Sequence, residues 1–168
     1  MKKIIFTASV MLIFTSALTS CRLPDFDYKK ITGYDTVGIV ERNSDDEEDL
    51  ISETVLTNEL PNLTGEYAFA ECEIIGRDSG KTYAIVVYGG FDFANGGVIE
   101  QSGGDLIVEY DYANPTAYKS MTGDEFNQNP NGFLPDGMLG ANGRTYSYYV
   151  NDLTNDLYEE AREYFVGD

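Results

Sequence analysis

Lys81-Thr82-Tyr83-Ala84-Ile85-Val86-Val87-Tyr88 is the most strongly patterned segment of this chain. From Tyr83 onward every side chain is apolar or aromatic, so an extended strand here presents two apolar faces. A strand of that composition is normally covered on both sides. The segment is therefore predicted to be a central strand of a sheet.

The residues before this strand predict its first partner. Glu66 to Ile75 alternates imperfectly between polar and apolar side chains, and Gly76 to Gly80 has the composition of a turn. Two strands joined in this way form an antiparallel hairpin. The apolar face of the first strand is expected to carry Ala68, Ala70, Cys72 and Ile74. Cys72 is accordingly expected to be a buried structural thiol.

Weaker signals predict the rest of the sheet. Val98 to Gln101 is expected to pair with Asp105 to Tyr112 across the turn residues Ser102-Gly103-Gly104. Thr145 to Val150 alternates and is expected to be a further strand, and a short strand is expected within 31–42.

Two helices are expected on either side of these strands in the sequence. Over 45–58, an acidic run with Ser44 before it and Glu47 three residues later matches a helix N-terminus with a capping box. A disordered acidic linker is the alternative. The chain ends in an amphipathic helix capped by Asn151 or Asp152, which should pack on one face of the sheet. Its apolar stripe is Leu153, Leu157, Ala161, Tyr164 and Phe165.

The first 21 residues have the order of an export signal. Lys2-Lys3 gives a positive start, and Ile4 to Leu18 is mostly apolar but short for a membrane span of about 20 residues. The closing residues Leu18-Thr19-Ser20-Cys21 resemble a lipobox, and the whole segment is similar to the signal peptide of bacterial lipoproteins. The resemblance implies cleavage before Cys21, acylation of that cysteine and anchoring in the cell envelope.

The predicted fold class is α+β: an antiparallel sheet of about five or six strands with a C-terminal amphipathic helix and an N-proximal helix. The chain divides into a signal peptide over 1–20 and a lipidated N-terminus and tether over 21–44, which includes the short strand. An acidic helix or linker over 45–60 and a β-rich globular domain over 61–168 follow.

The charge of the mature chain limits its partners. The full chain has 11 basic and 29 acidic residues. Removal of residues 1–20 removes Lys2 and Lys3, so the mature chain has 9 basic and 29 acidic residues and a net charge of −20. Such a charge repels nucleic acid and anionic lipid, and suits solubility, divalent cations or a cationic partner. The chain has no histidine, which removes the usual base for a serine or cysteine nucleophile. An enzyme is not expected.

The segment 114–144 is rich in Asn, Gly and Pro and is long for a connection in a small domain, which indicates a functional or disordered loop. A short helical turn is expected near Asp124 to Phe126. Alternating oxygen side chains followed by Gly132 resemble the opening of an EF-hand calcium loop, although Met138 replaces its bidentate Glu. Calcium is the only candidate cofactor, and a run of simple turns is the alternative. The candidate ligands are Asp124, Asn127, Asn129, Asn131 and Asp136.

Aromatic residues are the remaining candidates for binding. The chain has 13 Tyr and 9 Phe, and rings beside Asn, Gly and Ser in loops are typical of binding surfaces. Core positions are the alternative. The candidate binding residues are Phe91, Phe93, Tyr118, Phe126 and Phe133.

These features lead to a first hypothesis, a lipid-anchored cell-envelope protein with a non-enzymatic binding, display or shielding role towards a protein or glycan partner. Arg22, in place of Asp, favours the outer membrane in a host with two membranes. The second hypothesis is a periplasm-facing structural or assembly component of an envelope complex that docks through the sheet edge or the C-terminal helix. A calcium-dependent binding protein or enzyme is the third.

Overall fold

The computed structural model describes residues 38–39, 46–111, 113, 118–129, 132–140 and 142–167. The predicted signal peptide, Cys21 and most of the tether lie outside the described residues. The helices and strands are β1 (Gly38–Ile39), α2 (Glu47–Glu59), η2 (Leu60–Asn62), β2 (Tyr67–Asp78), β3 (Lys81–Ala94), β4 (Gly97–Tyr110), β5 (Tyr118–Thr122), α3 (Gly123–Gln128) and α4 (Tyr146–Val166). No helix among the described residues is long and apolar enough to span a membrane.

The sheet is a meander in which neighbouring strands follow chain order, β1-β2-β3-β4-β5. The four strands β2 to β5 are antiparallel, and β1 adds a two-residue parallel pairing to the start of β2. The predicted hairpin of 66–75 and 81–88 is confirmed and is longer than expected. The α+β class, the antiparallel sheet and both helices are also confirmed, but four antiparallel strands replace the expected five or six.

One missing strand results from a misplaced turn. Ser102-Gly103-Gly104 lies inside the continuous strand β4, and the chain reverses instead at Asn95 and Gly96, whose φ angles are 56° and 80°. β4 pairs with β3 along its whole length, from Ala94↔Gly97 to Thr82↔Tyr110. A long apolar strand that needs a partner along its length therefore outweighs the local turn signal of the glycines.

The second missing strand is the start of a helix. Thr145 to Val150 was expected to be extended, but Thr145 is the N-cap of α4 and its side chain accepts a hydrogen bond from the Tyr148 amide at 3.3 Å. The caps expected at Asn151 and Asp152 are therefore wrong, because both residues lie within the helix. Alternation of Tyr146, Tyr148 and Val150 is compatible with a strand, but Tyr149 and Leu153 continue a helical stripe that is buried against the sheet.

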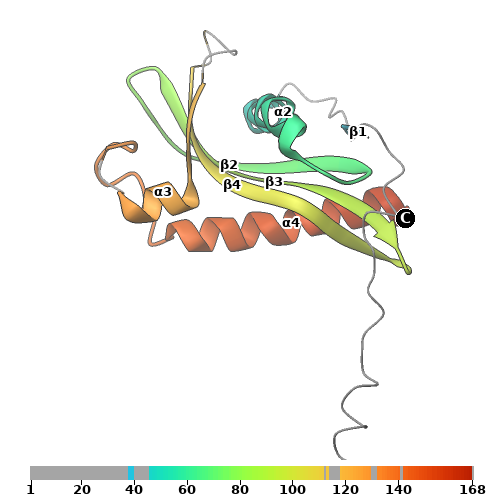
Figure 1. The fold of residues 1–168 in the computed structure, drawn as a ribbon. Helices are drawn as coiled ribbons and strands as arrows, with labels where there is room; N and C mark the ends of the chain where they lie inside the picture. Colours follow the sequence, from blue (N-terminus) through green and yellow to red (C-terminus); the bar gives the residue numbers. More distant parts are fainter. Residues whose placement is uncertain are drawn as a thin grey trace, which may run out of the picture. The chain divides into compact units, whose positions relative to one another are not determined.

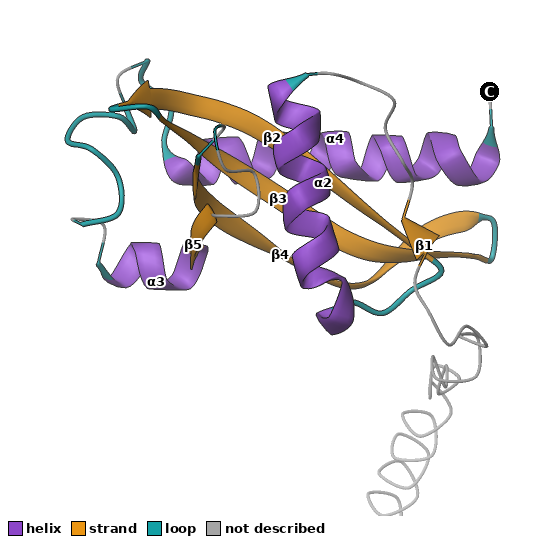
Figure 2. Cartoon of the chain, turned by 90° about the horizontal axis from the view of Figure 1, so that it is seen from above, coloured by secondary structure: helices purple, strands orange, loops and turns teal. Residues whose placement is uncertain are grey.

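The sheet separates two apolar cores, as Figures 1 and 2 show: α2 crosses one face and α4 runs along the other. β3 contributes to both, with Ala84 and Val86 on the α2 side and Ile85 and Val87 on the α4 side. All four side chains are buried. The prediction of a central strand covered on both faces is confirmed.

The acidic run is a helix rather than a linker. α2 begins after the N-cap Asp46, whose side chain accepts from the Glu48 amide, so the capping box predicted from Ser44 and Glu47 is wrong. Ser44 itself lies outside the described residues. Glu47 accepts a hydrogen bond from the Thr82 hydroxyl and lies 2.6 Å from the Arg77 guanidinium. The Thr82 hydrogen bond is the main reason that the pKa of Glu47 is lowered. The acids at the start of α2 thus complement the helix dipole and tie the helix to the hairpin beneath it.

The chain crosses over β3 on its way from η2 to β2. The Thr64 amide donates to Ser102 Oγ at 2.8 Å, and the Glu66 amide donates to the Phe91 carbonyl at 2.9 Å. A Cβ on Gly90 would collide with the Thr64 carbonyl. Glycine is therefore required at position 90 by the close approach of a second backbone segment.

Candidate binding groove

The first half of β4 is an open sheet edge. β5 pairs only with Leu106 to Tyr110, and no strand in the described part of the chain pairs with Gly97 to Asp105 on that side. β5 stops because Thr122 caps α3 with a capping box, in which Thr122 Oγ1 accepts from the Glu125 amide and the Glu125 carboxylate accepts from the Thr122 amide. The capping box turns the chain out of the sheet and leaves nine residues of β4 without a strand partner on that side.

α4 runs beside this open edge in the opposite direction to β4. Tyr146, at the start of α4, donates its hydroxyl hydrogen bond to Asp105. Tyr158 donates to Glu100 Oε2 at 2.6 Å. The open edge and the neighbouring flank of α4 are called the β4–α4 groove below, and Figure 1 shows α4 beneath the strands that form it.

A hollow lies at one end of the groove, near the C-terminal end of α4. This C-terminal hollow has a volume of about 690 Å³ and lies between the β3–β4 turn and the helix. It contains Arg162, which has no ion pair with any described residue, whereas the other four cations of the described ranges are paired with carboxylates. Its lining includes Gly97, Val98, Tyr158, Glu159, Arg162 and Glu163.

A second hollow lies at the other end of the groove, near the start of α4. This N-terminal hollow has a volume of about 360 Å³. Gly123 is required there, since a Cβ on it would collide with Asp105 and lie 2.6 Å from the Tyr146 hydroxyl. Its lining includes Gly103, Gly104, Asp105, Asp124, Asn127 and Tyr146.

The tyrosines along the groove remain protonated in the folded state. Burial, and then the bonded carboxylate Glu100, raises the pKa of Tyr158 to about 12. Burial and Asp105 raise the pKa of Tyr146 further above its ordinary value. Each phenol is therefore a donor that fixes a carboxylate of β4, and the floor of the groove is built from hydroxyl–carboxylate pairs.

Only one of the predicted binding aromatics is well exposed. Phe91 is completely buried and belongs to the core, so its assignment to a binding surface is wrong. Tyr118 is partly buried against the α2-side core, and Phe126 and Phe133 are partly buried against the α4-side core. Phe93 is 38% exposed and stacks on Phe165 with ring centroids 5.9 Å apart.

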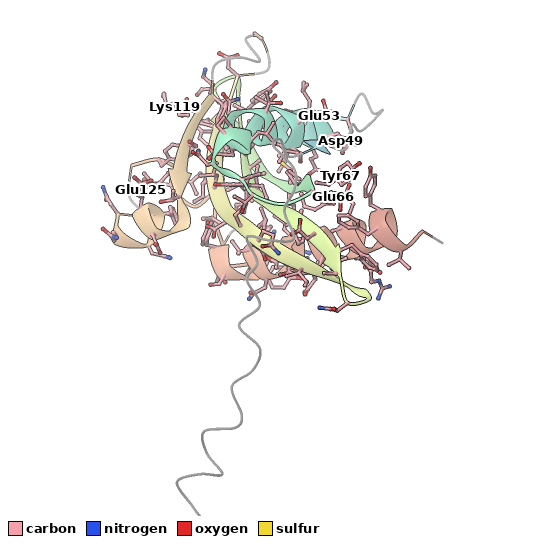
Figure 3. All side chains as sticks on the ribbon, turned by 45° about the vertical axis from the view of Figure 1, so that its right-hand side comes forward. Asp49, Glu53, Glu66, Tyr67, Lys119 and Glu125 are labelled. Carbon is pink, nitrogen blue, oxygen red and sulfur yellow. The ribbon has the colours of Figure 1, made fainter. Side chains whose placement is uncertain are left out.

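Further aromatic residues near the C-terminal end of α4 were missed as surface residues. Tyr158 and Tyr164 are 38% and 45% exposed. The Tyr164 ring lies 4.8 Å from Tyr67, which Figure 3 places at the beginning of β2. The helical spacing predicts Tyr164 in the apolar stripe of the helix, but spacing alone does not show that this end of the stripe is partly exposed. Tyr158 packs edge-on against Phe91 of β3 with ring centroids 5.2 Å apart, a contact between residues far apart in the sequence.

The predicted calcium ligands do not lie together in one loop. Asp124 and Asn127 both line the N-terminal hollow, and Asn127 lies within α3 rather than in a loop. Asn129 is the C-cap of α3, Asp136 lies exposed in the next loop, and Asn131 is outside the described residues. Among the residues that the structure describes, no group of three or more His, Cys, Asp or Glu side chains is placed to hold a metal ion.

The long segment 114–144 is largely tied to the domain where it is described. It contains β5 and α3, and the helical turn expected near Asp124 to Phe126 is confirmed as α3. Arg144 Nη1 lies 2.8 Å from Glu73 Oε1, and the guanidinium lies 4.9 Å from the centre of the Tyr148 ring. The Met138 side chain packs onto Gly76, where a Cβ would lie 3.0 Å from it. These contacts leave the β4–α4 groove, rather than this loop, as the stronger candidate for binding.

Cys72 is 8% exposed in the α2-side core, which confirms the expected burial.

The comparisons of this chain with protein-family models, curated proteins and solved structures found no match.

Proposed function

We propose that the chain is an exported protein, anchored to the cell envelope by lipid on Cys21, that binds a partner without catalysing a reaction. The binding part rests on the β4–α4 groove, where an open strand edge runs beside a helix. Such an arrangement is a recurring way of taking up an extended segment. The anchor is supported by the sequence of residues 1–21, and Arg22 favours the outer membrane in a host with two membranes.

The composition supports binding over catalysis. The chain has no histidine to activate a nucleophile. Cys72 is enclosed by apolar residues of the α2-side core, and burial of that kind makes a thiol inert. Calcium is not part of the proposal, because the EF-hand-like run begins inside the helix α3 rather than in a loop.

The anchor is tested by metabolic labelling with a palmitate analogue. The wild-type chain should incorporate the label and lose residues 1–20, whereas Cys21→Ala should remain an unlabelled precursor. Cys72→Ala is the matched control and should be labelled like the wild type. Normal maturation of Cys21→Ala would show that the lipid anchor is wrong.

A second candidate, a periplasm-facing assembly component, is favoured by the same open edge and helix. The two differ in which side of the membrane the domain faces. An epitope tag inserted after Asp136, an exposed position, reports this through protease treatment of intact and lysed cells. Cleavage in intact cells supports a surface-displayed binding protein, and protection until lysis supports the assembly component.

A further inference from the structure

We propose that the β4–α4 groove binds an extended, positively charged segment of a partner protein, which joins the open edge of β4 as an additional strand. This inference rests on the proposed binding function and specifies the chemistry of the partner. It combines three features of the groove: an unpaired strand edge, a helix wall beside it, and an excess of carboxylates.

The backbone of β4 provides the first feature. An edge strand presents alternate N–H and C=O groups outward, so the nine residues Gly97 to Asp105 offer such groups over a length of about 30 Å. α4 has 21 residues and at about 1.5 Å per residue extends over a similar length. The hydrogen bonds Tyr146–Asp105 and Tyr158–Glu100 hold the helix beside this edge at two points. A strand added here would therefore be paired on one side and flanked by α4.

The charges select the partner. Glu100 and Asp105 project from β4 towards α4, Asp124 borders the N-terminal hollow, and Glu159 and Glu163 border the C-terminal hollow. Five carboxylates thus lie along the edge and its two hollows, where the one guanidinium is that of Arg162 at the C-terminal hollow. The last turn of α4 has no basic residue, so the negative end of the helix dipole adds to the same field. Lysine or arginine at alternate positions of an incoming strand complements this field.

A second copy of the chain is a poor occupant. Two such edges would bring the same carboxylates face to face in a protein whose formal net charge is −18. Like charges on an edge strand oppose self-association. The groove thus favours a cationic partner over another copy of itself.

The test uses purified full-length chain in detergent and a fluorescein-labelled peptide of alternating lysine and valine, as long as the open edge. Fluorescence anisotropy should show saturable binding. The matched glutamate–valine peptide should bind at least about tenfold more weakly, because each lysine is replaced by a like charge. No saturable binding of the lysine peptide, or equal binding of the two peptides, would overturn the proposal.

A doubly methylated peptide separates strand pairing from charge attraction. N-methylation of the lysines blocks hydrogen bonding along one edge of the peptide, N-methylation of the valines blocks the other edge, and both preserve every charge. Reversal of the strand direction exchanges the edge that faces β4 while the lysines stay on the same side, so only a peptide methylated on both residues blocks pairing in both directions. This peptide should lose binding about tenfold, and unchanged binding would mean that the peptide is held by charge alone, contrary to the proposal.

Two charge-reversed variants locate the site. Glu159→Lys lies on the C-terminal hollow and should weaken binding at least about fivefold. Asp136→Lys makes the same change in net charge in an exposed loop outside the groove, and should leave binding nearly unchanged. Equal weakening of peptide binding by both variants would contradict binding in the groove. Sedimentation that detects a dimer of the chain, with the peptide excluded from it, would also contradict the proposal. Lipid labelling of Cys21 is measured separately, so a failure here is distinguishable from a failure of the anchor.

Discussion

The substitution Gly90→Ala tests the crossing of the Thr64 backbone over β3. A Cβ at position 90 collides with the Thr64 carbonyl oxygen and lies 3.0 Å from its carbonyl carbon. Both are backbone atoms, and Thr64 is held on its other side by the Ser102 hydroxyl at 2.8 Å. The collision therefore cannot be relieved by rotation of a side chain.

The expected cost follows from two opposing effects. Overpacking of a well-packed region costs about 1–3 kcal/mol, while replacing glycine by alanine within a strand returns about 0.5–1 kcal/mol. Because the clash involves backbone, we expect a net loss of about 2 kcal/mol in the free energy of unfolding. Gly97→Ala is the matched control, since no atom lies within 4 Å of its added Cβ and its φ is not positive. It should be neutral or slightly stabilising.

Urea denaturation followed by circular dichroism measures both variants. The midpoint of Gly90→Ala should fall with an unchanged slope, because the native fold and the exposed area are retained. If the two variants differ by less than about 0.5 kcal/mol, within the scatter of surface substitutions, the segment before β2 does not press on β3 as described.

Three further outcomes are expected. Leu157→Ala removes a side chain that is 1% exposed in the α4-side core, so urea denaturation should show a loss of about 2–5 kcal/mol in the free energy of unfolding. The control Asp156→Ala changes the exposed neighbouring residue and should alter this free energy by less than about 0.5 kcal/mol. Equal effects of the two variants would mean that α4 is not docked on the sheet. The pKa of Glu47 is lowered below 4.5, mainly by the Thr82 hydroxyl. The ionised Glu47 therefore stabilises the fold fully at pH values above the pKa it has in the unfolded chain, and this stabilisation is lost as pH falls through its pKa in the folded chain. Thr82→Val should therefore lower the melting temperature at neutral pH, with the difference shrinking in acid below pH 4.5; a difference that is constant with pH would contradict this. The pKa of Tyr146 is raised above 10 by burial and its carboxylate partner. The unfolded chain therefore releases the Tyr146 proton at lower pH than the folded chain, and stability falls as pH rises beyond 10. Tyr146→Phe should make this loss of stability with pH less steep, and an unchanged dependence of stability on pH would contradict the burial of the Tyr146 hydroxyl.

The elements that the sequence predicted well have strong local signals. The apolar run in β3 and the turn residues before it are adjacent in the chain, and a hairpin needs little else. The acidic start of α2 is likewise local, because acids favour the helix dipole within the first turn, although the cap is Asp46 rather than Ser44. The burial of β3 on both faces followed from its composition alone.

The errors arose where two local patterns competed. Gly103 and Gly104 have turn composition, but in the sheet they lie opposite Gly89 and Tyr88. A Cβ on Gly104 would lie 2.9 Å from the Tyr88 hydroxyl, so packing across the sheet accounts for this glycine. Thr145 similarly begins a pattern that fits a strand or a helix, and burial of the helical stripe decides between them.

The groove could not be predicted, because it depends on where elements end. Its open edge exists because β5 has five residues whereas β4 has 14, and its wall exists because α4 runs antiparallel to β4. Neither relation has a signal within a short window of sequence. The aromatic composition did indicate Phe93 correctly as an exposed ring, but it also selected the buried Phe91.

Residue-resolved amide hydrogen exchange of β4 tests the open edge most directly. In the free full-length chain, alternate amides of Gly97 to Asp105 should exchange rapidly because they face outward, while the outward amides of Leu106 to Tyr110 should be protected by β5. Addition of the lysine–valine peptide should slow the exposed set and leave the protected set unchanged. Uniform protection of β4 in the free protein, or no slowing of the exposed amides when the peptide is bound, would contradict the groove as a site for an added strand.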